Sequence, residues 1–141
     1  MQEKTTSALE RELSGCADLH EYLKENASSL RAPELPELLR RALQKSGLTR
    51  AEALRRSNLN PIYGYQIFSG KRRPSRDNLL CLCFGFGLRA DETQRLLKHA
   101  GYAQLYVKKP RDSILFYALD AGMDLVACNQ RLDASGEPPL G

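Results

Sequence analysis

Two short helical segments joined by a turn are the feature that most restricts how this sequence can fold. Thr49 can cap the first segment, because its hydroxyl can accept from the backbone of a glutamate three residues later, whose side chain can reach back. This segment is predicted to end near Asn58. Asn60 can cap the second segment, and Pro61 suits its first position, where a missing N–H costs nothing. The second segment is predicted to end at Gly70, so the two form a helix-turn-helix pair.

Helical patterns continue on both sides of this pair, and strand patterns are nearly absent. Apolar spacing and glycine stops predict further helices over 35–46, 76–86, 91–100, 111–121 and 124–133, with two short amphipathic segments before residue 34, the first broken at 14–15. We therefore predict an all-α chain with an N-terminal helical extension over 1–34, a helix-turn-helix domain over 35–100, a C-terminal helical extension over 101–133 and a flexible tail over 134–141.

The positive charge of the chain is concentrated in one third of its length. The whole sequence has a formal net charge of +4. Residues 31–76 carry eleven basic and three acidic side chains, which gives +8, whereas 1–30 sum to −3 and 77–141 to −1. Such a concentration is expected of a surface that meets phosphates, although an ordinary solvated basic face would look the same.

Four short motifs carry a resemblance to a known family. They are Gly47-Leu48-Thr49, Gly70-Lys71, Pro74-Ser75 and Leu79-Leu80. In this order and spacing the segment resembles the Cro/C1-type (lambda-repressor-like, XRE) helix-turn-helix family of bacterial and phage transcriptional regulators. The resemblance covers about 35–97, and 98–133 resemble an extension found in a subgroup of that family. It implies a five-helix repressor-like domain with two extra C-terminal helices, and sequence-specific binding to double-stranded DNA.

Four positions depart from the pattern of that family. Leu54 stands where the first motif helix usually has a small residue, so packing there must differ. Pro61 and Ile62 stand where the second helix usually begins with a polar or basic residue that reads bases. Gly64 lies inside that helix, where glycine costs about 1 kcal/mol relative to alanine. Its presence suggests that another helix or a partner approaches closely.

The candidate DNA-contacting residues lie at the starts of both helices, along the second helix and in the basic loop after it. Helix N-termini and basic side chains can contact phosphates, Asn and Gln can bond adenine, and apolar side chains can touch thymine methyl groups. The full set is Thr49, Arg50, Asn60, Pro61, Ile62, Tyr63, Tyr65, Gln66, Lys71, Arg72 and Arg73. Leu59 and Ile67 are expected to hold the second helix to the core. Leu59, Tyr63 and Ile67 recur every four residues, a spacing that would also suit an inward position for Tyr63.

Two alternatives concern protein partners. Pro61, Ile62, Tyr63 and Tyr65 would also form an aromatic, apolar patch suited to a protein partner, so the chain can be read as an interaction module derived from a helix-turn-helix domain. The apolar residues of 114–119 can supply a homodimer surface, as expected for proteins that bind paired half-sites. The same residues can instead cover the 76–86 helix of their own chain.

Catalytic and metal-binding patterns are weak. Neither His20 nor His99 has a nucleophile or carboxylate in a triad-like arrangement, and 85–87 lacks the lysine of a phosphate-binding loop. The cysteines have no framework spacing, which favours reduced, buried thiols. We therefore predict no enzymatic activity, no cofactor and no metal. A polar N-terminus and the absence of an apolar run of about 18 residues predict a cytoplasmic protein without a membrane partner.

Overall fold

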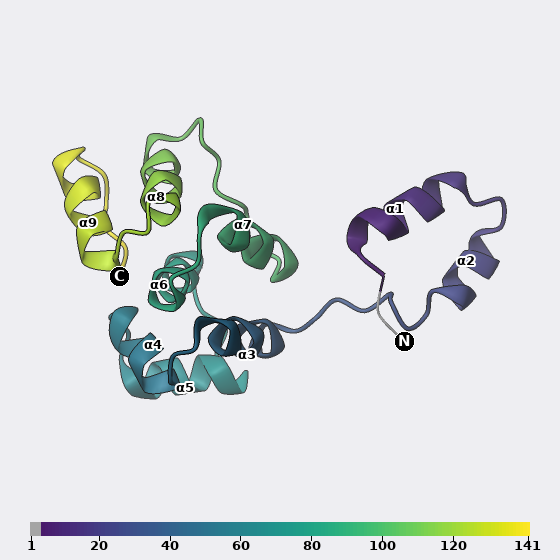
Figure 1. Cartoon of the computed structure of the whole chain (residues 1–141), viewed down its shortest axis with the longest axis horizontal. Helices are drawn as coiled ribbons and strands as arrows, with labels where there is room; N and C mark the ends of the chain where they lie inside the picture. Colours follow the sequence, from purple (N-terminus) through teal and green to yellow (C-terminus); the bar gives the residue numbers. More distant parts are fainter. Residues whose placement is uncertain (1–3) are drawn as a thin grey trace. The chain divides into compact units, whose positions relative to one another are not determined.

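The computed structural model describes residues 4–141, and this part of the chain is entirely helical, with nine α-helices and no strand (Figure 1). The predicted all-α class is therefore confirmed. The chain divides into two compact units, one ending at Ala32 and the other spanning Pro33–Gly141. The stretches predicted as a domain over 35–100 and an extension over 101–133 thus belong to one unit.

The first unit contains α1 (Thr6–Gly15) and α2 (Leu19–Glu25). The side chains of Thr5 and Asp18 cap them by accepting hydrogen bonds from backbone N–H groups in the first turn. The break predicted at 14–15 is confirmed, because α1 ends at Gly15 and α2 begins only at Leu19.

The core of this first unit is small and partly polar. Asn26 is almost fully buried, and its amide donates to a Glu12 carboxylate oxygen at 3.0 Å and to the Tyr22 carbonyl at 3.1 Å. Leu19, Tyr22 and Leu23 are spaced to share one face, yet only Tyr22 is buried, and Leu19 remains 57% exposed. The apolar face predicted here is therefore only partly covered.

The second unit packs its helices around α6. Its elements are α3 (Leu35–Ser46), α4 (Arg50–Arg56), α5 (Pro61–Ser69), α6 (Arg76–Phe86), α7 (Ala90–His99), α8 (Pro110–Asp120) and α9 (Leu125–Ala134). Every residue from Leu79 to Phe86 is buried, as expected from the apolar character of that helix. α6 lies between the α3–α5 group and the α7–α9 group (Figure 1) and contacts α3, α4, α7 and α9.

Two glycines allow helices to approach closely around α4. A Cβ atom placed on Gly64 of α5 would lie 2.3 Å from Cδ2 of Leu54. The large residue at position 54 is thus accommodated by the smallest one at 64. On the opposite side, a Cβ atom on Gly85 of α6 would lie 2.0 Å from Oγ of the buried Ser57. α4 is therefore held tightly between α5 and α6.

The last residues of the chain pack within the second unit, whereas the sequence predicts a flexible tail over 134–141. Leu140 is only 3% exposed, and its backbone forms two hydrogen bonds with the Asn129 side chain, at 2.8 and 3.0 Å. Arg111 donates to the carbonyls of Pro138 and Pro139 and pairs with Asp77 of α6. These long-range partners are not apparent from the sequence alone.

The apolar face of α8 is used mainly within its own chain. Leu115 and Leu119 are fully buried, and Ile114 and Phe116 are half-buried against the same core. Only Tyr117 remains exposed among the residues considered for a dimer surface. The structure therefore favours the alternative in which these helices cover the chain's own core, and α8 leaves little apolar area for a second copy.

Candidate nucleic-acid interface

The surface of α5 that faces away from the core is a narrow strip of four residues at helical spacing. Ile62, Tyr65 and Ser69 are exposed, and Gln66 between them is half-buried. Their i, i+3, i+4, i+7 spacing places them on one side of the helix. The Gln66 side-chain amide has no hydrogen-bond partner among the described residues, so its donor and acceptor are free for a ligand. Sequence reasoning missed Ser69, although the same spacing, counted from Ile62, would have included it.

The inward side of α5 is fixed by packing and by one polar contact. Ile67 is fully buried, and Leu59 packs against the core, as predicted. Tyr63 also packs against the core, and its hydroxyl accepts a hydrogen bond from the Asn78 amide of α6 at 3.1 Å. The prediction that Tyr63 points outward with Tyr65 is therefore wrong, because the four-residue spacing from Leu59 to Ile67 places it on the buried side.

Both helix starts are capped as expected. The Asn60 side-chain oxygen accepts from the backbone of Ile62 at 2.9 Å and of Tyr63 at 3.3 Å, and Pro61 follows at the first helical position. The Thr49 side-chain oxygen accepts from the Glu52 backbone N–H at 3.1 Å. The Glu52 carboxylate accepts in return from the Thr49 hydroxyl group, and not from the Thr49 backbone N–H as a capping box would have it. The second cap occupies the side-chain oxygen of Asn60. Only the side-chain NH₂ group of Asn60 is therefore left for a ligand.

Arg50 is positioned beside this strip by aromatic rings. Its guanidinium lies 5.2 Å from the centroid of the Tyr65 ring and 6.0 Å from that of Phe68. A guanidinium over an aromatic face is held by the charge distribution of the ring while its N–H groups remain available. Arg50 is thus a preoriented cation next to the exposed residues of α5.

The basic loop that follows α5 contains two cations without a partner and a third that forms contacts within the protein. Lys71 and Arg72 are exposed, and neither side chain forms an ion pair or hydrogen bond within the described part of the chain. Arg73 instead donates to the Ala100 carbonyl at 2.5 Å and lies 4.5 Å above the centroid of the Tyr102 ring. The structure therefore brings Lys71 and Arg72 to the candidate surface and assigns Arg73 to the contact between this loop and the end of α7.

Several other cations of the basic segment are neutralised locally. Arg41 pairs with Glu37, Lys45 with Glu92, and Arg76 with Asp112. Within residues 4–141, the basic residues between 31 and 76 whose side chains lack any such partner, ring contacts included, are Arg40, Arg55, Arg56, Lys71 and Arg72. The net charge of this segment thus overstates how many of its cations are free to bind phosphate.

The buried thiols are expected to be unreactive near neutral pH. Burial raises the pKa of Cys81 to about 11 and that of Cys83 to about 12. Cys128 is also buried and its pKa is raised to about 11, whereas Cys16 is half-buried. Thiols with such values are protonated near neutral pH and are poor nucleophiles, so these three cysteines act as apolar core residues.

No family model, curated protein or solved structure matches this chain in comparisons with known proteins. Among residues 4–141, no helix combines the length and apolar character needed to cross a bilayer. The site must therefore be interpreted from its own geometry.

A paired substitution should separate the two roles within the basic loop. Arg72→Ala should leave stability nearly unchanged. If this surface binds DNA, the substitution should also reduce the slope of log affinity against log salt by about 1, as expected for the loss of one phosphate contact. Arg73→Ala should instead lower the melting temperature, since the Ala100 carbonyl loses its donor. Thermal unfolding and salt-dependent binding of both variants test this. A salt slope that is unchanged in Arg72→Ala would remove Arg72 from the interface.

Proposed function

We propose that this chain is a sequence-specific DNA-binding regulator that inserts α5 into the major groove. In this proposal α3 to α7 form a repressor-like domain, and α4 and α5 form its helix-turn-helix pair. The observation that carries it is the strip Ile62, Tyr65, Gln66 and Ser69, which lies on a firmly packed helix with Arg50 on one side and Lys71 and Arg72 beyond its C-terminal end. Cations beside a groove-sized helix are placed to hold phosphates while the helix reads bases.

The chemistry of the strip favours adenine and thymine over guanine. Guanine is most often read by Arg or Lys, and the strip contains neither. The free amide of Gln66 can bond the N6 and N7 atoms of adenine in a bidentate way, and Ile62, which is 70% exposed, can touch a thymine methyl group. We therefore expect the preferred sites to contain A·T pairs at the positions that α5 contacts.

Selection of DNA from a random pool, at several stated salt concentrations, tests this proposal. The expected result is an enriched motif with A·T pairs at its centre and an affinity that falls steeply with salt. Replacing thymine by uracil at the enriched positions removes only the methyl group and should weaken binding. A pool that shows no enrichment, with affinity that hardly depends on salt, would contradict DNA binding by this surface.

A protein-interaction module is the second candidate, and a specific cavity favours it. A cavity of about 430 Å³ at the corner of α4 and α5 is lined mainly by apolar residues, among them Leu54, Leu59 and the exposed Tyr65, with Arg55 and Asn58 as its polar members. An apolar concavity next to exposed apolar side chains suits an anchoring side chain of a partner. Under this alternative, Ile62→Asp abolishes binding to the protein partner, while Arg72→Ala has little effect on it.

A further inference from the structure

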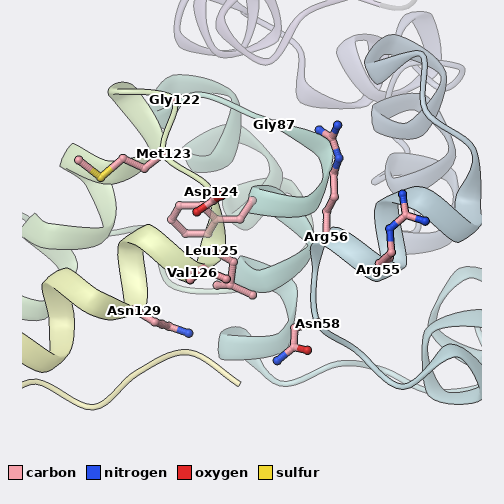
Figure 2. Close-up of a pocket in the computed structure, with 11 residues that line it drawn as sticks. Arg55, Arg56, Asn58, Gly87, Gly122, Met123, Asp124, Leu125, Val126 and Asn129 are labelled. Atoms are coloured by element: carbon pink, nitrogen blue, oxygen red, sulfur yellow. The ribbon is translucent and has the colours of Figure 1, made fainter.

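A second cleft on the second unit shares Arg55 and Asn58 with the cavity beside Tyr65, but none of its lining residues belongs to α5. It has a volume of about 600 Å³ and is formed where the C-terminal ends of α4 and α6 meet the N-terminal end of α9 (Figure 2). This volume is within the range of small-molecule sites in proteins. Figure 2 shows Arg55, Arg56 and Asn58 coming from the α4 side, and Asp124, Leu125 and Asn129 from the α9 side.

The charges around this cleft favour a ligand with a single negative charge. Arg55 and Arg56 are exposed, and within the described residues neither has an ion pair or a hydrogen bond to its side chain. Asp124 is the acidic residue of the lining, and its carboxylate is already engaged by the backbone N–H of Ala127 at 2.8 Å. Two guanidinium groups and one carboxylate leave an excess of one positive charge.

The remaining lining of the cleft supplies an apolar surface. Phe84 and Leu125 are almost fully buried within the protein yet contribute to the cleft, and Met123 is half-buried beside them. Val126 stands at the cleft with 67% of its surface exposed. A cleft with cations on one side and apolar side chains on the other fits a molecule whose two ends differ in polarity.

We propose that this cleft binds an organic monocarboxylate with an apolar body, with the carboxylate on Arg55 and Arg56 and the body against Phe84, Met123 and Leu125. Guanidinium groups bind carboxylates through charge-assisted hydrogen bonds, which a neutral analogue cannot form with the same strength. Because this site does not involve the exposed strip of α5, the proposal stands whether or not the chain binds DNA.

Calorimetric titration of the full chain with 4-phenylbutyrate and with 4-phenylbutanol tests this inference, because the two probes share an apolar body and differ in charge. The acid should bind with a dissociation constant on the order of 1 mM, and the alcohol at least about tenfold more weakly. At ten times that constant, the acid should raise the melting temperature by about 4 °C. Equal binding of acid and alcohol, or no binding of the acid at about 10 mM, would overturn the proposal.

Variants locate the binding to this cleft. The double variant Arg55→Gln/Arg56→Gln should lose the preference for the acid, whereas Arg40→Gln, which removes another exposed and unpaired cation, should keep it. Val126→Glu changes a largely exposed side chain and should weaken the acid about tenfold while leaving the alcohol unchanged, since it adds a like charge at the cleft. If the preference for the acid survives in the double variant, or is lost equally in Arg40→Gln, the acid does not bind here.

Discussion

Replacing Gly85 with alanine is expected to destabilise the second unit by about 3 kcal/mol or more. The new Cβ atom would lie 2.0 Å from Oγ of Ser57 and 2.6 Å from the Ala53 carbonyl oxygen. Ser57 is fully buried and donates its hydroxyl hydrogen to that same carbonyl at 2.6 Å. Because a backbone atom blocks the new methyl group, the rotation of one side chain cannot relieve the clash, and α4 must move away from α6.

Two other glycines provide graded controls for this expectation. Gly64→Ala should cost less, about 1–2 kcal/mol, because its Cβ atom meets only the side-chain atoms of Leu54, which can rotate. Gly15→Ala meets nothing within 4 Å and should be neutral or slightly stabilising. Urea unfolding of the three variants, monitored by circular dichroism, ranks their free energies of unfolding. A Gly85→Ala variant as stable as the wild type would show that α4 and α6 are not in close contact.

Local patterns predicted the helices well because each signal acts within a few residues. The caps Thr49 and Asn60, the first-turn Pro61 and the glycine stop at Gly70 set the bounds of α4 and α5 from the sequence alone. Proposed close approach at Gly64 is also borne out, with Leu54 as the neighbour. The caps and stops depend on hydrogen bonds and steric limits inside a single turn of helix, whereas the approach at Gly64 is a contact between two helices that are neighbours in sequence.

Long-range contacts account for what the sequence did not predict. Arg73 belongs to a run of three basic residues, and its assignment to the fold depends on Ala100 and Tyr102, which are distant in sequence. Leu140 lies at the end of a proline-containing stretch that looks unstructured, yet Asn129 holds its backbone. A sequence pattern shows where a cation or an apolar residue lies along the chain, but not which distant group will engage it.

Substitutions at two adjacent residues of α5 should have different effects, one on the free energy of unfolding and the other on base preference. Ile67→Ala is expected to cost about 2–5 kcal/mol of unfolding free energy, because a fully buried aliphatic side chain leaves a cavity. Gln66→Ala removes a half-buried amide with no partner in the described residues, so its effect on stability should be within about 0.5 kcal/mol. Its expected effect is on recognition, where loss of a bidentate contact should relax base preference by about 1–3 kcal/mol.

The measurement for this pair combines urea unfolding with binding to the selected DNA site and to a site altered at one A·T pair. Ile67→Ala should bind both sites more weakly by the same factor, its folded fraction, so that its discrimination is kept and a lower temperature restores its affinity. Gln66→Ala should bind the two sites more equally at every temperature at which it is folded. If Gln66→Ala keeps full discrimination and affinity, while Ile62→Asp abolishes capture of a protein partner, the strip on α5 is a protein-binding surface and not a reader of DNA.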